Sequence, residues 1–277
     1  MKKILPLHIL LLAFSPLTYS QTEVNTAPTP PEEKLPSGEE ITTKINARDE
    51  GQFVSRKLSL RLTDKRGKVR TRETRSYHKY YDDEKRTVIF FTEPKNIKGT
   101  AFLTYDYKAP KKEDNQWLYL PALRKVRRIS AADRGDYFLG TDMTYEDIKL
   151  ETKVSTVDYD FRTTGTCIND GHPGFAVEGI PINKKTAREL GYSKVLSCVD
   201  KAIWMIRNSQ FWDIKGNLLK TVNISNIEQI QGIWTQQTIT VENHKTKHHT
   251  TMTFSDVDYD SPVPENLFTT NAIKRGI

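Results

Sequence analysis

The chain has 277 residues, with 42 Lys and Arg against 35 Asp and Glu, which gives a formal net charge of +7 at pH 7. Apolar residues make up only 36% of the chain, yet they include 4 Trp, 12 Tyr and 11 Phe, so large rings carry much of the apolar material, as is typical of sheets. Beyond the first residues, no apolar run approaches the roughly 20 that span a bilayer as a helix, so no transmembrane helix is predicted. The length suits one large β domain or two ordinary domains.

Residues 1–20 have the three-part layout of a secretory signal. Lys2 and Lys3 precede an apolar run at 4–14, and small residues at 18–20 favour cleavage before Gln21. The run is too short to span a bilayer, although a retained anchor is the alternative. We therefore expect export across the inner membrane, a periplasmic location and a mature net charge of +5, because two lysines are lost. A mildly basic exported protein is expected to make peripheral contact with anionic lipid head groups and not to bind nucleic acid.

Residues 21–36 are polar and rich in proline, which predicts a disordered linker before a domain at 37–277. The Ser37 to Glu40 segment has the Ser-x-x-Glu pattern of a capping box, which predicts a helix start. Ile41 and Ile45 would share one face of this helix, and Gly51 would end it.

From residue 52 the apolar period changes from helical spacing to two. Leu58, Leu60 and Leu62 alternate with Ser59 and Arg61, which predicts a half-buried strand. A turn at 64–67 precedes further strands expected at 68–81, 88–91, 101–107 and 116–120. Later strands are expected at 152–159, 174–178, 194–199, 204–211, 218–227, 233–243 and 249–257.

Helical patterns are few after the first, at 145–150 and 184–190. About ten short strands joined by tight turns predict a mainly β fold, built as a single curved antiparallel sheet. An outer-membrane barrel is the competing interpretation, but residues 70–79 carry charge on both faces of their strand, which lipid-facing strands avoid.

Two cysteines, Cys167 and Cys198, remain in a chain that is expected to be exported. An even pair in an oxidising compartment predicts a disulfide, with two buried free thiols as the alternative.

Motifs of catalysis are absent from the sequence: it has no G-x-S-x-G, no phosphate loop and no G-x-G-x-x-G. His244 and His248 would share a strand face roughly 13 Å apart, with His249 on the other face, which disfavours a metal site. The alternating aspartates at 256–260 lack the glycine and the final glutamate of a calcium loop. Glu146 and Asp147 are adjacent and need not converge as an acid/base pair. We therefore predict no enzyme activity, no cofactor and no metal.

Three segments carry a recognisable pattern in order and spacing: FTEPKNIKGTAFL at 91–103, QWLYLPALRKVRRI at 116–129 and FLGTDMTYED at 138–147. GYSK at 191–194, VDK at 199–201 and PENLFT at 264–269 extend it. Over roughly residues 51–269 the chain resembles the LolA-like outer-membrane lipoprotein-sorting proteins, in the periplasmic branch associated with RND-type exporters.

The resemblance implies an incomplete β-barrel, in which a curved sheet wraps over lid helices with an apolar cavity between them. It also implies a carrier that passes lipid or lipoprotein acyl chains between envelope components, with an RND-type inner-membrane transporter as partner. A cavity needs only apolar lining and a few polar groups at its mouth. The candidates for the lining are Leu58, Leu60, Leu62, Phe90, Phe102, Trp117, Tyr119 and Leu120, each of which could equally be ordinary core.

Three arginines, Arg124, Arg127 and Arg128, are the candidates for the cavity mouth, where they would meet a phosphate or carboxylate. A solvated basic loop is the alternative interpretation of this segment. Two other functions stay open beside the carrier. One is a different envelope binding module, such as a regulator that senses lipoproteins or a scaffold, and the other is a hydrolase dependent on Glu146 or Asp147.

Overall fold

The computed structural model describes residues 34–109 and 112–277, of which Leu35–Ile277 form one compact unit. The expected signal at 1–20 and all but the last three residues of the expected linker at 21–36 lie outside the described residues. Those two assignments therefore stay predictions.

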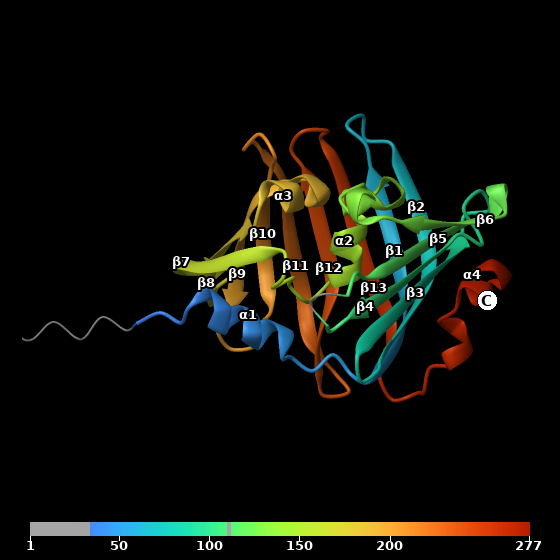
Figure 1. The fold of residues 1–277 in the computed structure, drawn as a ribbon, viewed down its shortest axis with the longest axis horizontal. Coiled ribbons are helices and arrows are strands. Elements are labelled where there is room, and N and C mark those ends of the chain that lie inside the picture. The colour runs from blue at the N-terminus through green and yellow to red at the C-terminus, as the bar shows by residue number, and fades with distance from the viewer. Residues whose placement is uncertain (1–33, 110–111) are drawn as a thin grey trace, which may run out of the picture. The chain divides into compact units, whose positions relative to one another are not determined.

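Within the described ranges, thirteen antiparallel strands form a single sheet, where the sequence predicted about ten (Figure 1). The sheet order is β6-β5-β4-β3-β2-β1-β13-β12-β11-β10-β9-β8-β7, so it is open, with β6 and β7 at its edges. The strands are β1 (Phe53–Thr63), β2 (Val69–Tyr80), β3 (Glu84–Glu93), β4 (Ala101–Tyr107), β5 (Asn115–Leu120), β6 (Lys125–Ile129), β7 (Tyr159–Asn169), β8 (His172–Pro181), β9 (Tyr192–Asp200), β10 (Ile206–Asp213), β11 (Leu218–Ile230), β12 (Ile233–Asn243) and β13 (His248–Asp258). The fold class is the incomplete antiparallel barrel that the sequence predicted.

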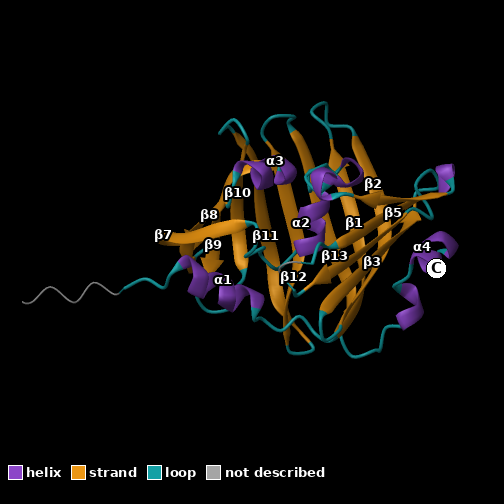
Figure 2. Cartoon of the chain, viewed as in Figure 1, coloured by secondary structure: helices purple, strands orange, loops and turns teal. Residues whose placement is uncertain are grey.

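The described part holds four α-helices: α1 (Gly38–Asn46), α2 (Tyr145–Leu150), α3 (Lys184–Leu190) and α4 (Thr270–Arg275) (Figure 2). The capping box predicted for α1 is present, since Glu40 N donates to Ser37 Oγ (3.1 Å) and Ser37 N donates to the Glu40 carboxylate (2.6 Å). The sequence missed α4, which follows the last strand. No helix in the described ranges combines the length and the apolar run needed to cross a membrane.

The two faces of the sheet bury separate cores because successive side chains in a strand point to opposite sides. The inner face, defined here as the one that α2 covers, buries residues such as Leu60, Phe102, Val222 and Phe254 against Ile148 of α2. The outer face buries Val88, Phe90, Ala101 and Leu103 against the C-terminal residues Val263, Phe268 and Ile273.

The strand expected at 152–159 was wrong. Most of this segment is irregular, and β7 begins only at Tyr159. Asn46 takes the place of a neighbouring strand, because its Nδ2 donates to Val154 O and its Oδ1 accepts from Val154 N, both at 3.0 Å. The segment can therefore leave the ladder with its backbone groups satisfied, and it lies over the inner face.

Cys167 and Cys198 form the predicted disulfide, with an S–S distance of 2.03 Å. It joins β7 to β9 across β8, where Gly174 lies opposite Cys167. A Cβ at Gly174 would approach Val199 O at 2.5 Å and both sulfurs at 3.0–3.1 Å, so only glycine leaves room for the bridge. The disulfide therefore fastens the edge strand β7, which has just one neighbouring strand in the sheet.

Replacing both cysteines by alanine is expected to lower the free energy of unfolding by about 3–4 kcal/mol, because the bridge closes a loop with a sequence separation of 31. Urea unfolding followed by circular dichroism measures the loss. A reducing agent should then destabilise the wild type but leave the double variant unchanged. Equal stability of the two oxidised proteins would contradict the prediction.

Candidate functional site

The connection between β6 and β7 crosses the inner face and carries α2 at its centre (Figure 1). Thr144 and Asp147 cap this helix reciprocally: Asp147 N donates to Thr144 Oγ1 (3.1 Å), and Thr144 N donates to Asp147 Oδ2 (2.7 Å). The Tyr145 ring lies 5.6 Å from the rings of both Phe102 and Phe138, measured between centroids. The helix is thus anchored at one end by an aromatic cluster on the sheet.

A buried lysine on the sheet holds the same helix in place. Lys220 on β11 is fully buried, and its Nζ lies 2.5 Å from Asp147 Oδ2 and 3.0 Å from Asp142 O. Tyr192 on β9 donates its hydroxyl to the same Asp147 oxygen at 2.9 Å. Burial, with the Asp147 charge beside it, raises the pKa of Tyr192 well above its ordinary value, so the phenol keeps the proton that it donates.

Further ion pairs lie along residues 144–158, which we call the α2 segment. Arg56 on β1 donates two hydrogen bonds to the Glu151 carboxylate, at 2.9 and 2.6 Å. Lys149 pairs with Glu146 at 2.8 Å and also with Asp114. Burial opposes its charge, but these carboxylates prevail and raise the pKa of Lys149, whereas burial raises the pKa of Glu146 despite Lys149 beside it. Since a buried charge is costly without a partner, the pairs hold the segment in one place.

Between this segment and strands β7, β9, β10 and β11 lies an apolar cavity of about 120 Å³. We call it the apolar cavity; its lining includes Leu150, Tyr159, Phe161, Phe211, Val222 and Ile224.

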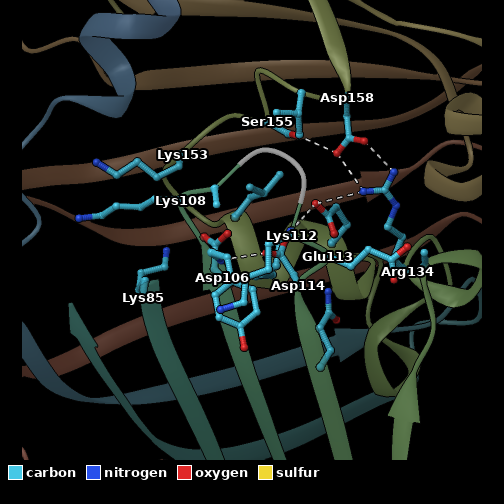
Figure 3. Close-up of a pocket in the computed structure, with 18 of the residues that line it drawn as sticks. Lys85, Asp106, Lys108, Lys112, Glu113, Asp114, Arg134, Lys153, Ser155 and Asp158 are labelled. Carbon is cyan, nitrogen blue, oxygen red and sulfur yellow. Dashed lines mark hydrogen bonds and ion pairs between the residues drawn. The ribbon is translucent and has the colours of Figure 1, made fainter. Parts of the chain in front are cut away.

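A second cavity of about 610 Å³ lies on the other side of the same segment, toward β3, β4 and β5 (Figure 3). We call it the charged cavity; its lining includes Lys85, Asp106, Lys108, Asp114, Lys149 and Lys153. Arg134 closes one end of it by donating two hydrogen bonds to the Asp158 carboxylate, at 2.9 and 2.7 Å.

The eight residues predicted to line a cavity do not lie together. Leu58, Leu60, Leu62 and Phe102 belong to the inner core around α2, and Leu120 packs against that core. Phe90, Trp117 and Tyr119 belong to the outer core instead. Trp117 and Tyr119 alternate with Leu118 and Leu120 along β5, so the two sets must face opposite sides. None of the eight borders the apolar cavity.

The three predicted mouth arginines also separate. Arg124 lies in the turn between β5 and β6 with φ of 49°, and Arg127 pairs with Asp133 at 3.1 Å. Arg128 donates to Asn115 Oδ1 at 2.7 Å and borders the charged cavity. The segment is mostly an edge strand, β6, and not the loop of the alternative interpretation.

Glu146 and Asp147 are engaged in the structural contacts described above. Among the described residues, no group of three or more His, Cys, Asp or Glu side chains is placed to hold a metal ion.

Sequence reasoning missed the residues that border the apolar cavity and the lysine beneath α2. Lys220, Val222 and Ile224 are two residues apart in the predicted strand at 218–227, so the sequence could have predicted that they share one face of the sheet. A lysine in phase with apolar residues is the signal for a buried cation, but its partner Asp147 lies 73 residues away in the chain.

Comparison with known proteins places the fold. A family model described as an uncharacterized protein matches residues 83–275. A structure from Vibrio parahaemolyticus, described as an outer membrane lipoprotein-sorting protein domain, is 32% identical with a TM-score of 0.77, and the match covers 86% of this chain and 98% of that chain. A DUF1329 family protein from Desulfovibrio piger is 28% identical with a TM-score of 0.77, over 85% and 97% of the two chains.

A LolA superfamily protein from Nitrosomonas europaea is 20% identical with a TM-score of 0.64, over 86% of this chain and 99% of that chain, which is a likeness of fold. None of the curated proteins matches the chain in sequence.

Replacing Lys220 by Met is expected to lower the free energy of unfolding by about 3–5 kcal/mol, because Asp147 is left buried without its cation. The Lys220→Met/Asp147→Asn double variant should recover part of that loss, and Lys215→Met in an exposed turn serves as the matched control. Urea unfolding measures all three. A Lys220→Met protein as stable as the control would contradict the account.

Proposed function

Because the chain belongs to the LolA-like family of outer-membrane lipoprotein-sorting proteins, we propose that it is a carrier of lipid or lipoprotein acyl chains. In this proposal the chain works in the periplasm and passes its cargo between envelope components, with an RND-type inner-membrane transporter as donor or acceptor. It needs no catalytic step, cofactor or metal.

The observation that carries the proposal is the apolar cavity beneath the α2 segment. Its lining includes rings and branched side chains from β7, β10 and β11, which suit hydrocarbon. Each methylene moved from water into such surroundings gains about 0.8 kcal/mol, so an acyl chain supplies its own binding energy. Sites of this kind need few polar groups.

The size of the cavity sets a condition on the mechanism. At about 120 Å³ it is smaller than the roughly 300–1,000 Å³ of typical ligand sites, so it holds part of a chain at most. Loading a whole chain therefore requires the segment around Leu150 and Val154 to move away from the sheet. The ion pairs of Arg56 with Glu151 and of Lys220 with Asp147 would resist that movement and return the segment afterwards.

The periplasmic location rests on the predicted signal at 1–20, and the Cys167–Cys198 disulfide supports it. Disulfides persist in the bacterial periplasm and are rare in the reducing cytosol.

Filling the apolar cavity is expected to abolish acyl-chain binding. Ile224→Trp should weaken the binding of a fluorescent palmitate analogue at least tenfold, because the indole occupies the space that the chain would take. Fluorescence titration of purified, delipidated protein measures the affinity. The matched control is Ile168→Trp, at a position 78% exposed on β7, which should bind as the wild type does.

Overpacking is expected to cost Ile224→Trp about 1–3 kcal/mol of stability, so circular dichroism must first show that the variant is folded. Undiminished binding by a folded Ile224→Trp protein would refute the assignment of the cavity. Wild-type protein that binds no palmitate analogue would refute the carrier proposal itself.

A further inference from the structure

We propose that the cargo is an anionic amphiphile whose phosphate or carboxylate head group is bound in the charged cavity while its chain enters the apolar cavity. This inference rests on the carrier function proposed above and specifies the chemical class of its cargo.

The two cavities are neighbours that share one wall. Glu146, Leu150, Lys153, Val154 and Ser155 border both of them. An amphiphile has a polar and an apolar end within one molecule, so it requires a polar and an apolar compartment side by side. The wall also contains the α2 segment that must move for loading, so one displacement would open both compartments.

The charged cavity holds more free positive charge than negative charge. Its acidic residues Asp114 and Glu146 pair with Lys149, while Asp158 and Glu189 pair with Arg134. The remaining acids of the lining are Asp106 and Glu113, whereas the remaining cations are Lys85, Lys108, Lys112 and Arg128, since Lys153 pairs with Glu50 at 3.6 Å. An anion entering the cavity would therefore meet an excess of cations.

Lys85 is the best placed of these cations. It is 7% exposed, lies on the inner face of β3 and borders the cavity. Its Nζ lies 5.9 Å from the centroid of the Tyr80 ring, and the carboxylates of Glu50, Asp106 and Glu151 act on its charge without forming a direct ion pair with it in the described ranges. Because none of these carboxylates contacts the buried ammonium directly, a ligand anion that does contact it would be stabilised.

Two further amines lie on the same side of the cavity as Lys85 (Figure 3). Lys153 Nζ donates to Asn46 O and Arg48 O, at 2.9 and 3.0 Å, and Lys108 Nζ donates to Asp82 O at 2.9 Å. Carbonyl partners hold both amines in position, and the Glu50 carboxylate lies 3.6 Å from Lys153 Nζ, so Lys108 keeps the less compensated charge of the two. Three lysines from separate segments thus provide the compact point charges that bind phosphate and carboxylate groups.

The test compares three amphiphiles that share one oleoyl chain: lysophosphatidic acid, oleate and monoolein. Tryptophan fluorescence or calorimetric titration below the micellar concentration gives each affinity. Wild-type protein is expected to bind the two anionic amphiphiles at least tenfold tighter than neutral monoolein. Lys85→Gln should remove most of that difference and leave monoolein binding unchanged, and Lys215→Gln, which removes the same charge from an exposed turn, should leave all three affinities unchanged.

Equal affinity for the three amphiphiles, with no effect of Lys85→Gln, would overturn the head-group site and leave the carrier proposal standing. Failure to bind any of them would overturn the carrier proposal. Titration with inorganic phosphate tests whether the site binds a free anion instead of a lipid head group. If Lys85→Gln weakens phosphate binding while the anionic amphiphiles bind no tighter than monoolein, the site serves a free anion and the inference is overturned.

Discussion

The buried ion pair between Lys220 and Asp147 determines where the connection between β6 and β7 lies, and the rest of the site depends on that placement. Lys220 is fully enclosed, so its charge must be matched locally, and Asp147 can match it only if α2 lies on the inner face of the sheet. Once α2 is there, the segment after it runs between the two halves of the sheet. That segment divides the space over the inner face into an apolar and a charged compartment.

A lid held by charges differs from one held by apolar contacts in how it can open. Apolar contact weakens gradually with exposed area, whereas an ion pair such as Arg56 with Glu151 has one favourable geometry and regains strong hydration when it separates. The two kinds of contact meet at α2, because Tyr145 and Ile148 pack on the core while Glu146 and Asp147 carry the charges. This arrangement suits a segment that is either fully docked on the inner face of the sheet or fully detached from it.

Local patterns predicted most of the fold. The helices expected at 145–150 and 184–190 coincide with α2 and α3, and the disulfide was predicted from the cysteine pair in a chain expected to be exported. The alternation of apolar and polar residues located most strands, but it did not show which residues of different strands face the same side of the sheet. Phe90, Trp117 and Tyr119 were therefore grouped with residues on the opposite face. The cavities were not predictable, because they depend on contacts such as Asn46 with Val154, which join residues 108 apart in the chain.

Hydrocarbon is expected to lie between the α2 segment and strands β7, β9, β10 and β11. Photocrosslinking with a diazirine-bearing fatty acid, followed by peptide mass spectrometry, tests it most directly because it reports position as well as binding. Labelling concentrated at Phe211, Val222 and Ile224 is the predicted result. Labelling confined to the outer face around Trp117 and Phe268, or none above that of an unrelated protein, would contradict the account.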